Sequence, residues 1–596
     1  MNQLLVVGEA SFDVLHLEDR TVESVGGAGM YTAMAASRCG AQVTMLSPRP
    51  DALPERLIPI AAHLVEWLGP DISPEKMLKF EISYRGGKTE YLNMSLDAVD
   101  MLTPTMLPED LSRYDLIHVD PRGDATKQLS FVQACRERGA KQISAGTGLF
   151  IAKEQSKTVR VVMELTDYFF MNELEAGYVF GSLESTKTEP GKVLFVTLGA
   201  QGACIIQGDT STCIPGVSAK VLDPTGAGDT FCGGTLAFLL QKRHPIMAAR
   251  QAVALAAEMI AQVGPTALLF DSPPPEMPLD TRVQVNEEQV ERVAGKVSAL
   301  SEASPFQFVS PEVPPVGHPR ALDYFFAFTL HQFSFWYVRN NRYHQPLIAT
   351  IGGVKLKGSD YLWSAFRRRL EDDADFCSPE RQANLSREEL LEVFRADNGD
   401  DPMPALDLRL EQAHSYGRDM LALQLTPQAV LDKALASAQP LQVFLDWLDR
   451  IGGYKEDPLR KKSALLALIL NQRPENFLPL RADEQITPVI DYHAQRSCLR
   501  FGLVDVIDEA LLDKLGDRQV VSPDEEWAVR YAAYRATERV AVLSGKSIGA
   551  VDWFFFSNAR KRCLEMSEPE CRSCPVDPVC AHRKELFQPV IRTSFY

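Results

Sequence analysis

The sequence suggests phosphate chemistry most clearly at residues 223–230, which read D-P-T-G-A-G-D-T and precede an apolar, helix-like stretch at 231–240. Three small residues in this run let backbone N–H groups approach an anion closely: Gly226, Ala227 and Gly228. The start of the following helix adds the positive end of its dipole, which favours a bound phosphate. Asp229 then stands where it can take a proton from a substrate hydroxyl. An ordinary strand-to-helix turn has a similar composition and is the alternative.

The D-P-T-G-A-G-D-T run resembles the second motif of the ribokinase-like (PfkB) sugar and nucleoside kinases, and other segments similar to that family occur in the same order. The resemblance implies a phosphotransferase that uses ATP and Mg²⁺, with Asp229 as the catalytic base. It also implies that Asn172 and Glu175, in a strand that runs into N-x-x-E, organise Mg²⁺ through water. The phosphate- and ATP-binding residues implied by the resemblance are Thr197, Gly199, Gly202, Gly226, Ala227 and Gly228.

The sugar side of the same resemblance rests on the N-terminal segment. Residues 3–8 (QLLVVG) read as a buried first strand, and Asp13 follows soon after. Gly26 and Gly27 precede a predicted helix at 30–39 and are similar to the family's sugar-binding glycine pair. Asp13 matches the acid that grips sugar hydroxyls. Tyr31 stands where the family usually has Asn, a departure that counts against ribose-type substrate contacts.

The secondary structure predicted to position these residues differs between the two halves of the chain. Before residue 271, short β-branched runs alternate with helical patterns, which predicts a parallel α/β sheet in a domain at 1–270. The proline-dense stretch at 271–282 is predicted to be a semi-rigid linker. From 283 to 596 helical periodicity dominates, and we expect an all-α domain, with clear patterns at 287–300, 387–395 and 527–544.

Composition limits the functional classes. A chain of 596 residues is too long for one core, and 45% hydrophobic with 24% charged residues is typical of a soluble globular protein. A net charge of -17 disfavours broad binding to a polyanion, so nucleic acid is an unlikely partner, although a local basic patch is compatible with it. Neither a membrane-spanning apolar run nor a secretion signal is recognisable. We therefore expect a cytoplasmic protein, and the scattered cysteines outside the C-terminal cluster fit a reducing compartment.

Isolated acids in the helical half could support glycosidic bond cleavage. Such cleavage passes through an oxocarbenium-like state, which a carboxylate near the anomeric carbon stabilises. Asp491 precedes an aromatic residue, a position that is also common for a helix cap. The F-S-F-W run at 333–336 is expected to be core. Lys461 and Lys462 could supply a lyase-type amine, but adjacent lysines at a helix start are usually solvated.

Several blocks of this half are similar to the queuosine salvage family, whose members are N-glycosylases that release queuine from queuosine 5′-monophosphate. The blocks lie at 318–319, 333–336, 358–370, 383–385, 394–397, 461–464 and 487–493. The resemblance implies a fold similar to the helix-hairpin-helix DNA glycosylases, with Asp491 as the catalytic acid of the D-x-H-x-x-R run. It also implies that His318 and Asp552 contact the base or the sugar. The L-P-G-V-G hairpin that grips duplex phosphates in endonuclease III-type enzymes is missing, which weakens a DNA-repair interpretation.

Four cysteines close to the C-terminus have the spacing of a metal site: Cys563, Cys571, Cys574 and Cys580. Four thiolates within eighteen residues can hold either a [4Fe–4S] cluster or a tetrahedral Zn²⁺ ion. The spacing resembles the iron–sulfur loop of endonuclease III-type enzymes, with a first gap one residue longer, and the resemblance favours the [4Fe–4S] cluster.

Together the two resemblances predict a bifunctional enzyme of nucleoside salvage. A ribokinase-like domain would phosphorylate the 5′-hydroxyl of queuosine or a related 7-deazapurine nucleoside, and the helical domain would then release the base. The alternatives are a glycosylase whose sugar product is phosphorylated, a sugar kinase fused to a nucleic-acid glycosylase or binding domain, and a helical scaffold without catalysis. The expected partners are a small nucleoside or nucleotide and, through the kinase domain, a second copy of the chain.

Overall fold

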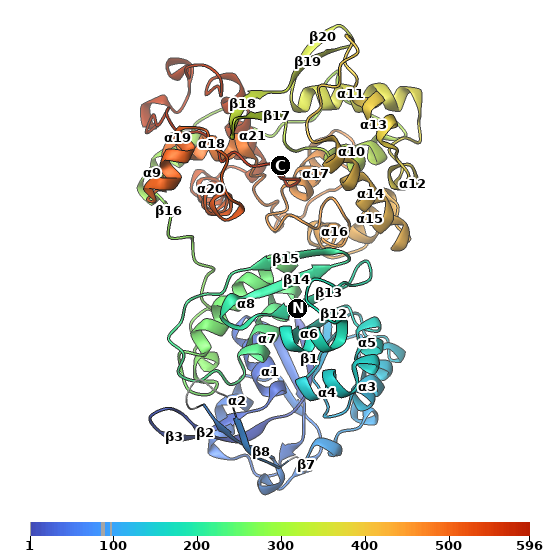
Figure 1. The fold of residues 1–596 in the computed structure, drawn as a ribbon, viewed down its shortest axis with the longest axis vertical. Helices are drawn as coiled ribbons and strands as arrows, with labels where there is room; N and C mark the ends of the chain where they lie inside the picture. The colour runs from blue at the N-terminus through green and yellow to red at the C-terminus, as the bar shows by residue number, and fades with distance from the viewer. Residues whose placement is uncertain (1, 85–89, 96–97) are drawn as a thin grey trace. The chain divides into compact units, whose positions relative to one another are not determined.

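The chain folds into two compact units. The computed structural model describes residues 2–84, 90–95 and 98–596. The first unit spans Met1–Pro278 and the second Leu279–Tyr596, so the division lies inside the proline-rich stretch (Figure 1). Each unit has its own hydrophobic core.

A nine-stranded sheet forms the centre of the first unit. Its strand order is β15-β14-β13-β12-β11-β10-β1-β4-β6. The pairs from β13 to β6 are parallel, and β14 and β15 close one edge as antiparallel strands. The strands are β1 (Gln3–Val7), β4 (Gln42–Leu46), β6 (Glu66–Leu68), β10 (Leu116–Val119), β11 (Ile143–Gly146), β12 (Tyr168–Asn172), β13 (Val193–Thr197), β14 (Ala203–Gln207) and β15 (Thr210–Ile214). The carboxyl ends of the parallel strands meet at one edge, where ligands bind in open α/β sheets.

Helices cover both faces of this sheet (Figure 1). Leu4 and Val6 of β1 pack in the core with α1, α7 and α8, whereas Leu5 and Val7 pack in the core with α3, α5 and α6. This alternation is the two-residue period of a strand that is buried on both faces. The helices are α1 (Ala28–Arg38), α2 (Ile58–Ala62), α3 (Ala125–Glu137), α4 (Leu149–Glu154), α5 (Ser156–Glu164), α6 (Glu173–Phe180), α7 (Ala227–Leu240) and α8 (Pro245–Met259). The predicted α/β architecture is confirmed.

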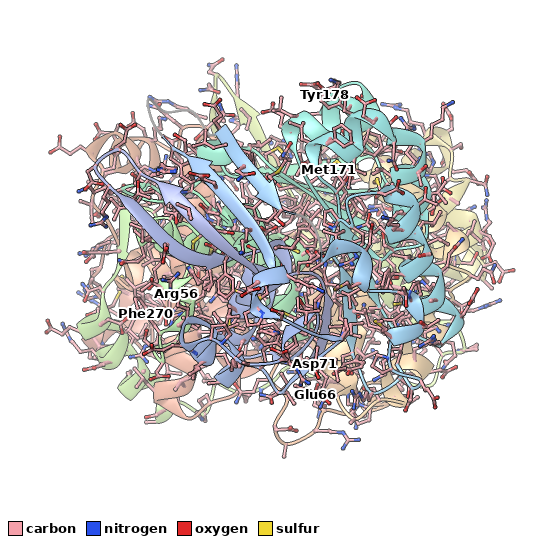
Figure 2. All side chains as sticks on the ribbon, turned by 90° about the horizontal axis from the view of Figure 1, so that it is seen from below. Arg56, Glu66, Asp71, Met171, Tyr178 and Phe270 are labelled. Atoms are coloured by element: carbon pink, nitrogen blue, oxygen red, sulfur yellow. A yellow bond between two sulfur atoms is a disulfide. The ribbon has the colours of Figure 1, made fainter. Side chains whose placement is uncertain are left out.

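A second, four-stranded sheet carries the first candidate sugar-binding acid. Its order is β3-β2-β8-β9, formed by β2 (Ser11–His16), β3 (Thr21–Gly26), β8 (Leu78–Ser83) and β9 (Glu90–Ser95). Asp13 lies in the middle of β2. Two further short strands, β5 (Arg49–Pro50) and β7 (Asp71–Ile72), pair with each other, and Asp71 is labelled in Figure 2.

The second unit consists of two helical lobes. Helices α10, α11 and α13 to α17 share one hydrophobic core and form the first lobe with α12, which packs on α14, while α9 and α18 to α21 share another core and form the second lobe. The chain therefore enters the second lobe, crosses to the first and returns. The helices are α9 (Glu287–Ser298), α10 (Ala321–Thr329), α11 (Ser359–Asp372), α12 (Pro379–Ala383), α13 (Arg387–Phe394), α14 (Leu406–Ala422), α15 (Pro427–Leu435), α16 (Pro440–Leu448), α17 (Lys461–Gln472), α18 (Tyr492–Phe501), α19 (Glu509–Gly516), α20 (Pro523–Ser544) and α21 (Ile548–Lys561).

The expectation of an all-α second half is wrong in one respect, because this unit also contains short strands. They are β16 (Val283–Val285), β17 (Trp336–Arg339), β18 (Arg342–Pro346), β19 (Ile348–Ile351), β20 (Val354–Lys357) and β21 (Val504–Val506). They form three antiparallel pairs, β16 with β21, β17 with β18, and β19 with β20. Strands of three to five residues are too short to show an alternating pattern in the sequence. The pair β19–β20 leads directly into α11, at the edge of the candidate site.

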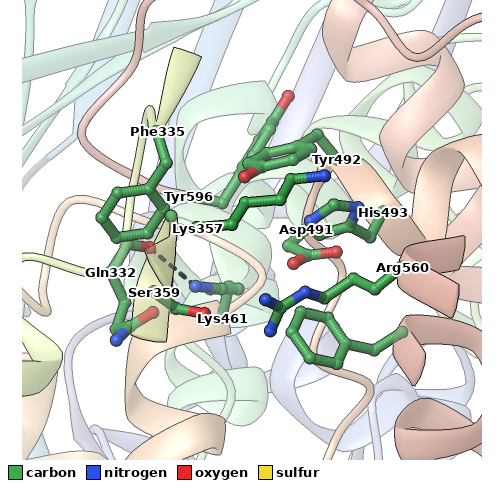
Figure 3. Close-up of a pocket in the computed structure, with 12 residues that line it drawn as sticks. Gln332, Phe335, Lys357, Ser359, Lys461, Asp491, Tyr492, His493, Arg560 and Tyr596 are labelled. Atoms are coloured by element: carbon green, nitrogen blue, oxygen red, sulfur yellow. Dashed lines mark hydrogen bonds between the residues drawn. The ribbon is translucent and has the colours of Figure 1, made fainter. Parts of the chain in front are cut away.

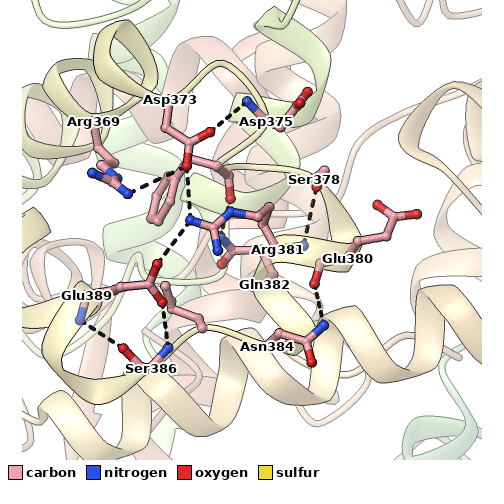
Figure 4. A network of polar contacts seen from close by, with 12 residues as sticks. Arg369, Asp373, Asp375, Ser378, Glu380, Arg381, Gln382, Asn384, Ser386 and Glu389 are labelled. Carbon is pink, nitrogen blue, oxygen red and sulfur yellow. Dashed lines mark hydrogen bonds and ion pairs between the residues drawn. The ribbon is translucent and has the colours of Figure 1, made fainter.

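One block of the predicted salvage resemblance has a structural role. Arg381 of α12 forms ion pairs with Asp373 at 2.9 Å and with Glu389 at 3.0 Å (Figure 4). Ser386 caps α13 in a reciprocal capping box with Glu389. The Asn384 side chain donates a hydrogen bond to the Glu380 carbonyl oxygen at 2.8 Å. This network joins α12 to α13.

The cysteines outside the C-terminal cluster are not all free thiols. Cys204 of β14 and Cys213 of β15 are partners in the strand register and form a disulfide, which corrects the expectation of scattered reduced cysteines. The pairing depends on the β14–β15 register, which the sequence does not reveal. No helix among the described residues is long and apolar enough to cross a membrane.

Candidate active sites and a cysteine cluster

The glycine-rich run forms the N-terminus of α7, as the sequence predicts. Gly226 is the N-cap of α7 with φ 73°, a left-handed conformation that favours glycine. A Cβ atom on Gly226 would lie 2.4 Å from the ring of Tyr31, so the ring packs directly on the loop backbone. Asp223 fixes the start of the run, because it accepts hydrogen bonds from the Thr225 N–H at 2.9 Å and from the Gly264 N–H at 2.8 Å.

Asp229 lies in the first turn of α7 and is partly buried. Burial, together with the neighbouring Asp120, raises the pKa of Asp229 to about 7, and His118 opposes the rise. A carboxyl group with a pKa near neutrality is suited to exchange a proton with a substrate hydroxyl.

Asp13 lies against the glycine pair. Its Oδ1 accepts a hydrogen bond from the Ser11 hydroxyl at 2.7 Å, and a Cβ on Gly26 would lie 1.8 Å from its Oδ2. Gly27 has φ 97° and precedes α1. The side chain is 3% exposed, and burial raises the pKa of Asp13 to about 6. Only a residue without a side chain at position 26 leaves room for this carboxylate.

Asn172 and Glu175 form a reciprocal capping box at the start of α6. The Asn172 N–H donates to Glu175 Oε2 at 2.8 Å, and the Glu175 N–H donates to Asn172 Oδ1 at 2.9 Å. Burial raises the pKa of Glu175 to about 7. Figure 2 labels Met171, next to Asn172 in β12, and Tyr178 on the helix that follows. The capping box accounts for both residues structurally, and Glu175 keeps Oε1 outside it.

The predicted nucleotide loop connects β13 with β14. Thr197 ends β13, and Gly199 and Gly202 both have positive φ values, 59° and 103°. The Leu198 N–H donates to the Gly202 carbonyl oxygen at 2.8 Å and closes the loop. A Cβ on Gly202 would lie 2.1 Å from the Ile214 carbonyl oxygen, so glycine is required there.

Sequence reasoning missed a buried polar cluster at the carboxyl ends of β1 and β10. Glu9 pairs with Arg122, and the His118 Nε2 lies 3.1 Å from Asp120 Oδ1. A Cβ on Gly8 would lie 2.0 Å from Asp120 Oδ2. Burial raises the pKa of Glu9 to about 7. The sequence position of Glu9 and Asp120 could have predicted this cluster. Each residue follows a buried strand at the ligand-binding edge of the sheet.

A cavity of about 360 Å³ lies between the two lobes of the second unit. Lys461 comes from α17 of the first lobe, while Asp491 and Asp552 come from the second lobe. A smaller chamber shares Asp491 and Lys461 with this cavity and is drawn in Figure 3. The aromatic walls of the cavity are Phe306, Phe308, Trp363, Trp553 and Phe556. The site thus combines aromatic surfaces with the Lys461 amine and four carboxyl groups, those of Glu312, Asp360, Asp491 and Asp552.

Asp491 is both a helix cap and a cavity residue. It is the N-cap of α18, and its Oδ1 accepts a hydrogen bond from the Ala494 N–H at 2.9 Å. Burial raises the pKa of Asp491, whereas the positive charge of Lys461 lowers it. Burial and the Asp491 charge together raise the pKa of Asp552 far above its usual range. Asp552 Oδ1 is buried and has no hydrogen-bond partner among the described residues.

The two lysines are buried, which corrects the expectation that they are solvated. Lys461 is 4% exposed, its Nζ donates to the Gln332 carbonyl oxygen at 2.7 Å, and burial lowers its pKa to about 8 (Figure 3). Lys462 is 2% exposed and donates to Gln412 Oε1 at 2.9 Å. It does not line the cavity. The chain enters α17 at Arg460 in a left-handed conformation.

The structure does not bring His318 to this cavity. The residue is not part of the lining, and its Nδ1 accepts a hydrogen bond from the Arg320 N–H at 3.1 Å, two residues along the same turn. The predicted contact of His318 with the base or sugar is therefore not supported by the arrangement. The His-Pro pair lies in the turn before α10, and a contact of His318 with the base or sugar stays a prediction.

Two cations of the smaller chamber have acidic partners. Arg560 is bidentate with Asp360, at 3.0 and 2.7 Å, and Lys357 pairs with Glu565. Figure 3 shows the Asp491 carboxylate, the Lys461 amine and the Arg560 guanidinium around the same space. Gly358 and Ser359, at the N-terminus of α11, also line this chamber. Positive charge and helix-start N–H groups therefore lie next to Asp491.

The four C-terminal cysteines are free thiols that lie close to one another. Cys563, Cys571 and Cys574 all raise the pKa of Cys580, although burial is the largest cause. The Arg500 guanidinium donates to Cys563 Sγ at 3.5 Å, and the His582 N–H donates to Cys580 Sγ at 3.3 Å. Within the described residues, the ligand atoms that gather within 4.8 Å of one another belong to Cys571, Asp577 and His582.

Family models match both units. The family model "pfkB family carbohydrate kinase" matches residues 77–271, and the model "Queuosine salvage protein" matches residues 313–448. A cytidine kinase from Thermococcus kodakarensis is 24% identical over 250 residues, which are 40% of this chain and 88% of that protein. A ribokinase from Lactococcus lactis is 34% identical over 120 residues, which are 20% of this chain and 38% of that protein.

A solved structure also resembles the chain. The nucleoside kinase from Burkholderia thailandensis in complex with inosine has 21% identity, covers 46% of this chain and 94% of its own, and has a TM-score of 0.39. The match to the salvage family ends before Lys461, Asp491 and Asp552. The chain thus carries a PfkB carbohydrate kinase domain in its N-terminal half and a queuosine salvage protein domain in its C-terminal region.

Proposed function

We propose that this protein phosphorylates a nucleoside at its 5′-hydroxyl and then hydrolyses the N-glycosidic bond of the nucleotide to release the base. The proposed substrate is queuosine or a related 7-deazapurine nucleoside, and ATP with Mg²⁺ serves the first step. The union of the two domains in one chain carries this proposal, because the kinase would make the monophosphate on which the salvage domain acts.

In the first step Asp229 takes the proton of the acceptor hydroxyl while Asp13 holds other hydroxyls of the acceptor. The N–H groups at the start of α7 face the transferred phosphate. ATP brings the phosphoryl group, and Mg²⁺ neutralises its charge. Glu175 fits a water-mediated role toward the ion, because its Oε2 is used in the capping box and its Oε1 is not.

In the second step a water molecule adds to the anomeric carbon as the base departs with a proton. The Asp491 carboxylate stabilises the positive charge that develops on the sugar and orients the water. Phe306 and Trp553 are stacked 4.1 Å apart in the wall of the cavity and offer a flat apolar surface to the base. The chamber beside Asp491 supplies Arg560 and the start of α11 for the phosphate of the nucleotide.

The direct test is incubation of the protein with queuosine and Mg·ATP, with the products followed over time by mass spectrometry. We expect queuosine monophosphate to appear first and free base to follow. Release of base without ATP would contradict the proposed order and would favour a glycosylase whose sugar product is phosphorylated afterwards.

Lys461 is expected to tune Asp491. Its positive charge lowers the pKa of Asp491, so Lys461→Met should raise that pKa and protonate the carboxylate at a higher pH. The acid limb of the pH profile for base release should move to higher pH, while Lys461→Arg should leave it nearly in place. The measurement is the rate of base release from the monophosphate between about pH 4 and 8. An unshifted acid limb in Lys461→Met would contradict an effect of the Lys461 charge on Asp491.

We propose that the four cysteines hold a [4Fe–4S] cluster. A single Zn²⁺ ion with ligands at about 2.3 Å would hold thiolate sulfurs about 3.8 Å apart. The atoms that converge to within 4.8 Å in the described chain are instead those of Cys571, Asp577 and His582. The spacing of Cys563, Cys571, Cys574 and Cys580 in the sequence supports the cluster, and the convergent trio is the Zn²⁺ alternative.

Protein purified without oxygen is expected to show a broad absorbance shoulder near about 400 nm. Cys563→Ala should remove the shoulder, because it deletes a cluster ligand, whereas His582→Ala should keep it. The opposite pattern in metal analysis, with zinc lost in His582→Ala and retained in Cys563→Ala, would favour the trio.

A further inference from the structure

The disulfide between β14 and β15 is the exception among the cysteines of this chain. Cys204 and Cys213 face each other in the antiparallel register and are bonded, while the other cysteines are free thiols. Where most thiols are reduced, the disulfides that do form are usually transient and have catalytic or redox-sensing roles. The bonded pair is therefore a candidate for reversible oxidation.

The end of β15 packs directly on the predicted nucleotide loop. A Cβ on Gly202 would lie 2.1 Å from the Ile214 carbonyl oxygen, and a Cβ on Gly216 would lie 2.3 Å from the Ala200 carbonyl oxygen. The Gly216 N–H also donates to the Gln201 carbonyl oxygen at 3.2 Å. Backbone thus rests on backbone with no side chain between, so a shift of β15 is transmitted to the loop.

The disulfide fixes both sides of this contact. Cys204 follows Gly202 by two residues on β14, and Cys213 immediately precedes Ile214 on β15. β15 is the last strand of the sheet, where it pairs with β14 (Figure 1). The S–S bond lies one residue pair from the end of this ladder that borders the loop. Its loss would leave the edge strand to its hydrogen bonds and packing.

The disulfide is open to a thiol from solvent. Cys213 is exposed, whereas Cys204 is fully buried. An attacking thiolate needs access to a sulfur atom, so it forms a bond to Cys213 Sγ and breaks the bond to Cys204, which leaves and takes up a proton. The second thiol of a dithiol then displaces this mixed disulfide and returns Cys213 as a thiol. The dithiol becomes a disulfide, and two electrons and two protons pass to the protein.

We propose that the Cys204–Cys213 pair is a reversible redox switch, in which the disulfide favours ATP binding by the first unit and its reduction by a dithiol weakens that binding. The bond holds the outer side of the nucleotide loop in one arrangement, so less ordering remains to be done when the nucleotide binds. The inference rests on the proposed role of residues 197–202 in ATP binding. It assigns no catalytic step to either cysteine.

The test measures nucleotide affinity directly, without a phosphoryl acceptor. Air-oxidised protein and protein treated with dithiothreitol are titrated with Mg²⁺ and a non-hydrolysable ATP analogue by isothermal calorimetry. Alkylation and mass spectrometry report the state of the pair in the same samples. We expect dithiothreitol to convert the pair to two thiols and to raise the Kd for the analogue about five-fold or more. The double variant Cys204→Ser, Cys213→Ser should have the raised Kd under both conditions.

The matched control is Cys135→Ala, which deletes a buried free thiol of α3 and keeps the pair. Its Kd should respond to dithiothreitol as that of the unmodified protein does. An equal Kd in oxidised and reduced protein would overturn the switch, and so would a pair that stays bonded after the treatment or is found as thiols before it. Failure of the proposed nucleoside kinase function would be recognised separately, as binding of the analogue without any phosphorylated nucleoside in the activity assay.

Discussion

Replacing Asp229 by Asn is expected to lower ATP-dependent phosphorylation of the nucleoside by about 100-fold to 10 000-fold, the range that a general base contributes. The variant keeps the size and polarity of the side chain in the first turn of α7, so the loop and its contact with Tyr31 should be preserved. Release of base from ready-made monophosphate should be unaffected, because that step belongs to the other unit. Both rates can be measured on the same preparation.

The control for this variant is Asp124→Asn. Asp124 is a partly exposed N-cap of α3, and Asn caps a helix as well as Asp does, so phosphorylation should stay within about two-fold of the unmodified rate. Retained release of base from the unphosphorylated nucleoside in Asp229→Asn would contradict the relay between the two steps. Retained phosphorylation would remove Asp229 from the chemistry.

The pH dependence of phosphorylation tests the same residue independently. The pKa of Asp229 is raised to about 7, so the carboxyl group is protonated below that pH and cannot accept a proton. The phosphorylation rate should therefore fall about ten-fold per pH unit below 7 and level off above it. Since Asp120 contributes to the raised pKa, Asp120→Asn should move the acid limb to lower pH. An acid limb near pH 4 would indicate a different base.

The sequence predicted those parts of the fold in which a local pattern determines the structure. The buried first strand, the helix after the D-P-T-G-A-G-D-T run and the helices α9, α13 and α20 all have patterns long enough to recognise. The strands of the second unit have three to five residues, and their pairing depends on packing against helices far away in the sequence. For the same reason the Cys204–Cys213 pairing could not be predicted.

In the candidate sites, too, features set by a local motif could be predicted, whereas features set by packing between distant segments could not. Asp13 and Gly26 were paired by motif, and their contact follows from the register of β2 with β3. Lys461 was expected in solvent because adjacent lysines at a helix start are usually hydrated, yet the chain folds this turn between two lobes. His318 shows the converse, since its motif position led to the expectation of a ligand contact while its turn holds it away from the cavity. Which residues of one chain face the same cavity is decided by packing between lobes, and no spacing rule contains that information.

Replacing Asp491 by Asn is expected to lower base release from the nucleoside monophosphate by about 100-fold or more, the effect of losing charge stabilisation in a transition state. Asn can still accept the Ala494 N–H, so the cap of α18 survives and the loss isolates the negative charge. Phosphorylation of the nucleoside should be spared, and the monophosphate should therefore accumulate. The matched control is Asp508→Asn, because Asp508 caps α19 through the Leu511 N–H and does not line the cavity. A release rate in Asp491→Asn equal to that of the control would remove this carboxylate from the mechanism and would leave Asp552, another acid of the cavity, to be tested in its place.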